Sequence, residues 1–170
     1  MRTIPKRVVL FVWGDRPSFP IRHSYKPITH TKMSVILKKG KTKNILMPVT
    51  PSQAFTADTF VKFSSGKLVP CQSGDAAALV EGVIRKTIAS TDADYANDRL
   101  VEIEVPVERH CQYEIDVNSG LVATDLGTEF DLADAATVDH AGTTDKAVKL
   151  IKYLSATKGI FYVKFSGSGY

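Results

Sequence analysis

Cysteine is scarce in this chain of 170 residues, which contains only Cys71 and Cys111. Two cysteines are too few for a disulfide scaffold, and their separation of forty residues gives no C-x₂₋₄-C pair of the kind that binds zinc. The two could still pair with each other. We interpret them as two half-buried thiols.

Long apolar runs are also missing. A bilayer-spanning helix needs about 20 apolar residues, and no segment approaches that length. The apolar run Val8–Trp13 follows basic residues, as in a secretory leader, but it is six residues long and leads into Asp15-Arg16-Pro17 instead of a small-residue cleavage site. The sequence therefore predicts no membrane association and no secretion.

Motifs for catalysis or cofactor binding are absent from the sequence. G-x-G-x-x-G, G-x-S-x-G and H-E-x-x-H do not occur, and Gly40-Lys41-Thr42 fails as a phosphate loop because position 35 is Val35 instead of glycine. On a strand, His110 and Cys111 would point to opposite faces, so they form no dyad. We therefore expect no enzyme activity, no catalytic residue, no cofactor and no metal.

Acidic residues crowd one short stretch, which includes Asp125, Glu129, Asp131, Asp134 and Asp139. A divalent-cation site is one interpretation of such a cluster. The spacing of an EF-hand loop is missing, however, so we favour aspartates that cap loops on a solvated face.

The charge of the chain is strongly segregated. Residues 1–43 contain eleven Lys/Arg and one acid, a net charge of +10, whereas residues 44–170 contain eleven Lys/Arg and seventeen acids, a net charge of −6. The first segment also holds four prolines before residue 33, which block helix and interrupt a strand ladder. We predict a basic extended N-terminal arm over residues 1–43 and a folded acidic domain over residues 44–170.

The arm itself changes character at Met33, where MSVILKKGKTKNILMPV begins. This resembles a natural protein start, so residues 1–32 could be an upstream extension of the reading frame. N-terminal sequencing or the intact mass of the native protein would decide this, and a native peptide that begins at Arg2 would contradict it.

From Met33 onward the pattern is that of a mainly β protein. Short apolar or alternating runs are separated by turn residues, which predicts strands at Ile45–Val49, Phe60–Phe63, Leu68–Cys71, Val80–Ile88 with a bulge at Gly82, Leu100–Val107, Gln112–Val117 and Ile160–Phe165. Asp75–Val80 could be one helical turn. Lys146–Leu154 fits a helix or a strand, and its short connection to the final strand favours a hairpin. The predicted architecture is a small β-barrel or sandwich domain.

The basic segment allows three functional interpretations. It could dock on an acidic protein surface by adding a strand to a neighbouring sheet, or bind phosphates while aromatic side chains such as Trp13 stack on bases, or act as a solubilising tail. Because the acidic body would repel a nucleic acid lying across it, we favour protein docking over nucleic-acid binding.

The C-terminal two-thirds of the chain resembles the head decoration, or cement, proteins of tailed double-stranded DNA phages, of the lambda-head-decoration-like type. The resemblance covers about Met33–Phe165 and is carried by Ser73-Gly74-Asp75, Ala78–Val83, Gly127–Leu132, Ala136–Asp139 and the continuation Lys146–Val163. The additional residues 1–32 depart from the usual short arm of that family.

This resemblance implies a non-enzymatic, trimeric β-barrel protein of the virion. Such proteins sit on the outer surface of an expanded capsid, and an N-terminal arm reaches over subunits of the major capsid protein. We expect the docking arm to include the augmenting strand Val35, Ile36 and Leu37 and the steering charges Lys38, Lys39, Lys41 and Lys43. The alternative function is nucleic-acid binding through the same basic arm.

Overall fold

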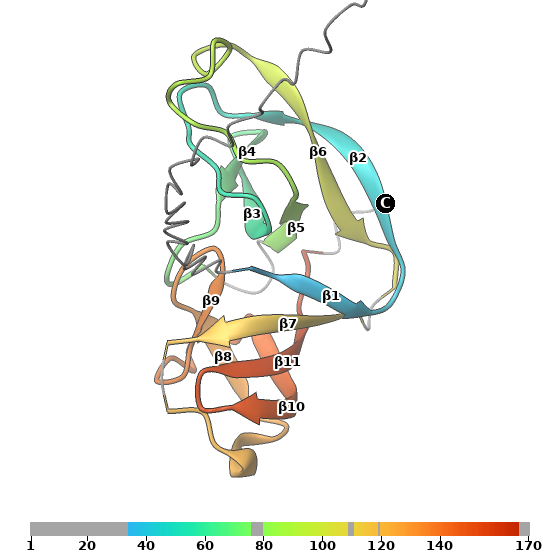
Figure 1. The fold of residues 1–170 in the computed structure, drawn as a ribbon, viewed down its shortest axis with the longest axis vertical. Helices are drawn as coiled ribbons and strands as arrows, with labels where there is room; N and C mark the ends of the chain where they lie inside the picture. Colours follow the sequence, from blue (N-terminus) through green and yellow to red (C-terminus); the bar gives the residue numbers. More distant parts are fainter. Residues whose placement is uncertain (1–33, 76–79, 109–110, 119, 167–170) are drawn as a thin grey trace, which may run out of the picture. The chain divides into compact units, whose positions relative to one another are not determined.

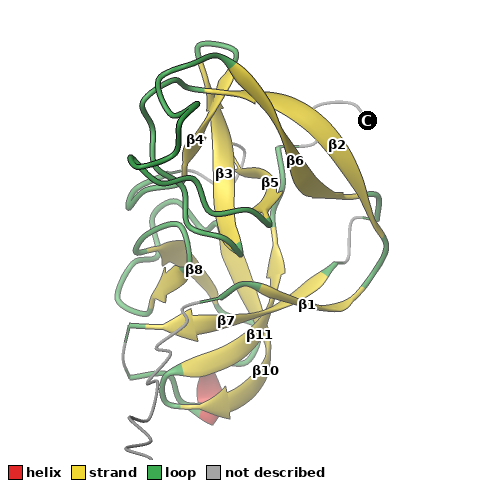
Figure 2. Ribbon diagram, turned by 45° about the horizontal axis from the view of Figure 1, so that its top comes forward, coloured by secondary structure: helices red, strands yellow, loops and turns green. Residues whose placement is uncertain are grey.

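The computed structural model describes residues 34–75, 80–108, 111–118 and 120–166, and within these ranges the chain is almost wholly β (Figures 1 and 2). The mainly β fold class is therefore confirmed. One 3₁₀ turn, η2 (Ala123–Asp125), interrupts the strands in the described part of the chain. The strands are β1 (Ile36–Lys39), β2 (Thr42–Val49), β3 (Thr59–Ser64), β4 (Lys67–Pro70), β5 (Val80–Ile84), β6 (Arg99–Pro106), β7 (Gln112–Val117), β8 (Glu129–Leu132), β9 (Thr137–Asp139), β10 (Val148–Ser155) and β11 (Lys158–Val163).

Five of these strands close into a first barrel, in the order β2-β4-β3-β5-β6. Strands β2 and β6 form a long antiparallel pair, from Thr42 opposite Pro106 to Val49 opposite Arg99. The ring is completed by one parallel pair, Val49 with Leu68 on β4. The contact between β2 and β4 that closes the ring is therefore a single residue pair.

Alternation along β6 determines which side chains fill this barrel. Val101, Ile103 and Val105 are buried, whereas Leu100 is 62% exposed. Successive side chains on a strand point to opposite faces, so the odd-numbered positions face the interior. The interior cluster consists of Val49, Phe55, Val61, Leu68, Ile84, Ile88, Val101, Ile103 and Val105.

The remaining strands form a second sheet in the order β1-β7-β11-β10-β8-β9. Strand β7 also pairs in parallel with β9, through Asp116 opposite Thr137 and Val117 opposite Val138, which closes five of the strands into a second ring. The first half of the same edge of β7 pairs with β1. The sequence predicted one barrel or sandwich, whereas the described chain forms two rings.

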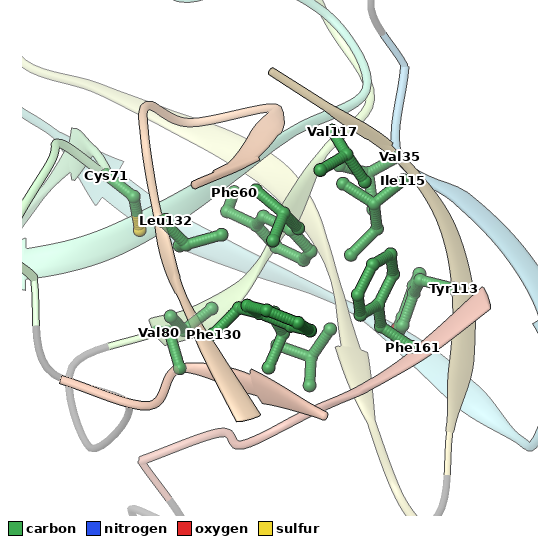
Figure 3. Close-up of a cluster of buried hydrophobic side chains, with 14 of the residues drawn as sticks. Val35, Phe60, Cys71, Val80, Tyr113, Ile115, Val117, Phe130, Leu132 and Phe161 are labelled. Atoms are coloured by element: carbon green, nitrogen blue, oxygen red, sulfur yellow. The ribbon is translucent and has the colours of Figure 1, made fainter. Parts of the chain in front are cut away.

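Side chains of the first ring also enter the core of the second (Figure 3). Phe60 on β3 and Val80 on β5 belong to the same buried cluster as Tyr113 on β7. The rings of Phe60 and Tyr113 meet edge to face with centroids 6.1 Å apart, and the backbone N–H of Phe60 donates to Ala135 O over 2.6 Å. Burial holds the pKa of the Tyr113 phenol well above its ordinary value.

The segment after β11 joins the two rings as well. The ring of Phe165 lies 5.9 Å from that of Tyr113 and 6.5 Å from that of Phe60. Ser166 donates from its backbone N–H to Val80 O over 2.9 Å and from its hydroxyl to Glu81 Oε1 over 2.7 Å. The last described residues of the chain therefore hold β5 of the first ring.

Most of the strands predicted from the sequence are confirmed, including the β10–β11 hairpin and the bulge beside Gly82. Two short strands, β8 and β9, were not predicted; they lie in the stretch of clustered acids. A strand at Val35–Leu37 was predicted, but as part of the arm, whereas β1 belongs to the second sheet. Residues 1–33, which hold the possible upstream extension and most of the predicted arm, and residues 76–79 of the possible helical turn lie outside the described residues.

Candidate docking edge

Val35, the first residue of the predicted augmenting strand, is fully buried. Its backbone N–H donates to Asp58 O over 2.9 Å, and its carbonyl accepts from Arg85 Nη1 over 2.8 Å. The side chain lies in the core shown in Figure 3. Val35 thus anchors the start of the folded unit, which spans Lys32–Tyr170. The boundary that the sequence suggested after residue 43 falls inside β2.

Arg85, which follows β5, fixes this anchor. Its Nη1 also donates to Asp58 Oδ1 over 3.2 Å, while Nε and Nη2 donate to Glu104 Oε2 over 3.1 and 2.9 Å. One guanidinium therefore links the residue before β1 to the loop before β3 and to β6. Hydrogen bonds between ionised groups are stronger than those between neutral groups, which makes this link rigid. Sequence analysis missed Arg85 and Asp58, because nothing in their local pattern indicates distant partners.

The predicted augmenting strand is already an edge strand of this chain. β1 pairs with β7 through Ile36 opposite Glu114 and Leu37 opposite Tyr113, and a register shift follows before Lys39. Leu37 packs against the core, whereas Ile36 is 40% exposed. No other strand in the described part of the chain pairs with the far edge of β1. Its backbone groups on that side are open to another strand.

The four lysines that the sequence predicted as steering charges differ in their partners and in their exposure. Lys38 Nζ lies 2.8 Å from Glu114 Oε2, and Lys41 Nζ lies 4.0 Å from Glu108 Oε1. Lys39 is exposed on β1, and Lys43 is half-buried on β2. Hydrogen bonding and charge from Lys38, followed by Lys158, hold the pKa of Glu114 below its ordinary value. Lys38 is also exposed but is held by its close ion pair with Glu114, so Lys39 and Lys41 are the exposed lysines of this segment that such a pair does not hold.

Gly40 turns the chain sharply between β1 and β2. Its φ is +109°, and a Cβ placed there would lie 2.6 Å from Cys111 Sγ and 2.8 Å from Cys111 Cα. The Lys41 carbonyl accepts from Val107 N–H over 2.9 Å and from the Cys111 thiol over 3.4 Å. Only glycine fits this corner, where the chain leaves β1 and enters β2. We call β1 and the corner at Gly40-Lys41 the docking edge.

The other groups considered in the sequence have structural roles. Cys71 and Cys111 are buried free thiols. The clustered aspartates cap loops, and Asp131 accepts three backbone N–H groups. His140 Nε2 lies 2.9 Å from Asp125 Oδ2, and its ring stacks on Phe130. The described residues contain no group of three or more His, Cys, Asp or Glu side chains placed to hold a metal ion.

Comparison with known proteins adds no relative: no family model matches the chain, and no curated protein matches it. Among the described residues, no helix is long and apolar enough to cross a membrane.

Proposed function

We propose that the chain is a non-enzymatic decoration protein that binds the outside of an expanded phage head and stabilises it by bridging major capsid protein subunits. The observation that carries this proposal is the docking edge, whose outer side has no strand partner among the described residues, which bears lysines, and which follows the basic N-terminal segment in the sequence. An open edge provides the backbone groups for strand addition, and the lysines provide long-range attraction to an acidic partner.

The residues that carry the resemblance also support the proposal, because they shape both rings. A Cβ at Gly82 would lie 2.5 Å from Glu104 O. The Asp131 carboxylate accepts from the backbone N–H groups of Thr144, Asp145 and Lys146 over 3.0, 2.7 and 2.6 Å. These positions maintain the β framework that a decoration protein of this type requires.

In the proposed complex, residues Val35–Lys43 act in two ways. Val35 and Leu37 fix β1 to the folded unit, while the open side of β1 receives an extended segment of the major capsid protein. Lys39 and Lys41 attract acidic groups of that segment, and the basic charge of the N-terminal segment adds to this attraction. We further propose a homotrimer, because three weak docking edges that act together bind far more tightly than one.

Co-sedimentation with purified phage heads tests this function. The protein should bind expanded heads and leave unexpanded heads unoccupied, because preferential binding to one lattice stabilises that lattice by linkage. Equal binding to both lattices, or binding to neither, would contradict the proposal.

The docking edge is tested by reversing its two exposed charges. Lys39→Glu with Lys41→Glu should weaken binding to expanded heads by about tenfold or more, mainly through slower association at low salt. The matched control is Lys149→Glu with Lys152→Glu, two exposed lysines on β10 that undergo the same charge change. An equal effect of both double variants would show that net charge, and not the docking edge, governs binding.

Nucleic-acid binding is the second candidate function, favoured by the eleven Lys/Arg and single acid of residues 1–43. A gel shift with double-stranded DNA that weakens steeply with salt and disappears when residues 1–32 are deleted would support it. Binding to expanded heads without any such shift would support decoration instead.

A further inference from the structure

The ion pair between Lys62 and Asp75 is unusually enclosed. Lys62 lies on β3 and Asp75 follows β4, and their side chains are 18% and 10% exposed. Lys62 Nζ contacts Asp75 Oδ1 directly. By contrast, the side chains of the pair Lys67–Asp98 are 37% and 74% exposed. Because water is largely excluded from both side chains, the charged forms of the amine and the carboxyl group are poorly solvated there and depend on each other for stabilisation.

A second carboxyl group, that of Glu81, lies beside this pair. The pairing of β3 with β5 shifts between Val61, which is opposite Gly82, and Lys62, which is opposite Val80. Glu81 is therefore the extra residue of a bulge next to Lys62. It is 8% exposed, and the Ser166 hydroxyl donates to its Oε1 over 2.7 Å.

The buried thiol of Cys71 is influenced by the charges of Lys62, Asp75 and Glu81. Its pKa is raised to about 12, chiefly by burial; Asp75 and Glu81 contribute to the rise, and Lys62 opposes it. All three side chains therefore lie within electrostatic range of one buried atom.

Asp75 is also held by a backbone donor on its other oxygen. The N–H of Gln72 donates to Asp75 Oδ2 over 2.6 Å. A preorganised N–H aimed at a carboxyl oxygen stabilises negative charge that develops there during acyl transfer. The site thus combines an amine, a polarised carboxyl carbon, an oxyanion donor and a second carboxyl group.

We propose that Lys62 and Asp75 become joined by an intramolecular amide bond. Within the ion pair, a proton passes from Nζ to Oδ1, which leaves a neutral amine and a carboxylic acid. The Nζ lone pair attacks Asp75 Cγ and forms the N–C bond, while the negative charge collects on Oδ2 beside the Gln72 N–H. Glu81 takes a proton from Nζ and returns it to Oδ1, which leaves as water when the Cγ–Oδ1 bond breaks. Nothing is oxidised or reduced, and water is the only other product.

The new bond would fasten the connection between β4 and β5 to strand β3. It converts the segment from Lys62 to Asp75 into a covalent loop, which restricts the unfolded chain as a disulfide does. The first ring could then no longer open between β3 and that connection. Proximity alone favours the reaction, because both partners are held in contact before it begins.

The intact mass of the purified full chain, measured under denaturing conditions, tests this proposal directly. The expected mass is that of the sequence less one water molecule, and digestion should yield a branched peptide that contains both Lys62 and Asp75. The full sequence mass, unchanged after prolonged incubation of the folded protein, would overturn it. The measurement uses the isolated chain, so its result is independent of binding to phage heads.

Variants identify the atoms involved. Lys62→Arg preserves a cation but removes the amine, and should restore the full mass. Glu81→Gln preserves an acceptor for Ser166 but cannot carry the proton, and should slow bond formation at least tenfold. Lys67→Arg, in the exposed pair with Asp98, is the matched control and should still lose one water. A loss of water that persists in Lys62→Arg would arise from another reaction, such as succinimide formation, and would overturn the proposal.

Discussion

At the residue scale, two positions illustrate how strictly the fold limits its side chains. At Gly82 any Cβ would meet the backbone of β6, and a backbone atom cannot move away as a side chain can. At Asp131 the carboxylate accepts hydrogen bonds from three consecutive backbone N–H groups of the loop before β10 and so fixes the path of that loop. Each position therefore has a specific and measurable cost of substitution.

We expect Gly82→Ala to lower the free energy of unfolding by about 1–3 kcal/mol, because the added methyl group must push β5 away from β6. Urea denaturation measures this change. Gly66→Asn is the control, since a Cβ at Gly66 meets nothing within 4 Å and asparagine tolerates its positive φ. If Gly82→Ala lowers the free energy of unfolding no more than Gly66→Asn does, the steric explanation is wrong.

Asp131→Ala should lower the free energy of unfolding by about 2–4 kcal/mol, because it leaves three backbone donors beside a buried position without their acceptor. Asp98→Ala removes an exposed carboxylate paired with Lys67 and should cost less than about 1 kcal/mol. Thermal unfolding of both variants provides the comparison. Equal losses would show that the hydrogen bonds of Asp131 contribute no more than a surface ion pair.

At the element scale, β1 is the strand whose attachment matters most for the proposed function. It has one paired edge, and it is held by the Arg85–Val35 hydrogen bond at its start and by the Lys38–Glu114 ion pair on its exposed face. Both of these attachments are polar and add to the apolar packing of Val35 and Leu37. The hold on β1 therefore responds in part to charge, whereas the apolar interiors do not.

Acid should loosen β1 through Glu114. The pKa of Glu114 is depressed in the folded state by Lys38 and Lys158, so its contribution is complete above the unfolded pKa of about 4.3 and is lost as the pH falls through the lower folded value. The melting temperature of the native protein should therefore fall more steeply below about pH 4.3 than that of Glu114→Gln, which cannot titrate at this position. If the melting temperatures of the two proteins fall equally steeply at acid pH, Glu114 does not contribute to stability in this way.

Arg85→Ala should release the start of β1 without unfolding the barrels. Amide hydrogen exchange at Val35 and along β1 should accelerate by about tenfold or more, because the variant removes the donor to the Val35 carbonyl. The neighbouring variant Lys86→Ala is the control, since the exposed Lys86 is next in sequence and carries the same charge. Unchanged exchange along β1 in Arg85→Ala would show that pairing with β7 alone holds the strand.

The sequence allowed prediction of strands whose alternation is strong, such as β6 and β7, because burial on one face leaves a period-two pattern. It predicted a strand at Val35–Leu37 but assigned it to an arm, since ILKK carries two lysines and resembles an exposed segment, although Val35 before it is buried. It could not reveal the docking edge or the Lys62–Asp75–Glu81 cluster. Both depend on which strands close the rings, and pairing between distant segments leaves no local signal.

At the scale of the whole molecule, side chains from both rings contribute to one of the two buried clusters. Phe60, Val80 and Val83 of the first ring belong to the same buried cluster as Tyr113, Phe130 and Phe161 of the second. The described end of the chain adds Phe165 between Phe60 and Tyr113. Because neither ring can lose its partner without exposing apolar surface, we expect the folded unit to unfold in one cooperative step.

Phe165→Ala should test this coupling. It removes an aromatic ring that contacts both rings of strands, and should lower the free energy of unfolding by about 2–4 kcal/mol. Deletion of residues 167–170 is the control and should have little effect, because Phe165 and Ser166 remain in place. Calorimetry should show one transition in the native protein. Two separate transitions there would indicate that the shared cluster does not couple the rings.

The hidden phenol of Tyr113 gives the molecule a convenient optical property. Because burial raises its pKa well above that of an exposed tyrosine, its ultraviolet absorbance in alkaline solution will change only when the core opens. The single tryptophan, Trp13, belongs to the basic N-terminal segment, so its fluorescence reports on that segment. Two spectroscopic channels, one for the core and one for the segment proposed to reach the capsid, can thus be followed in the same cuvette without any added label.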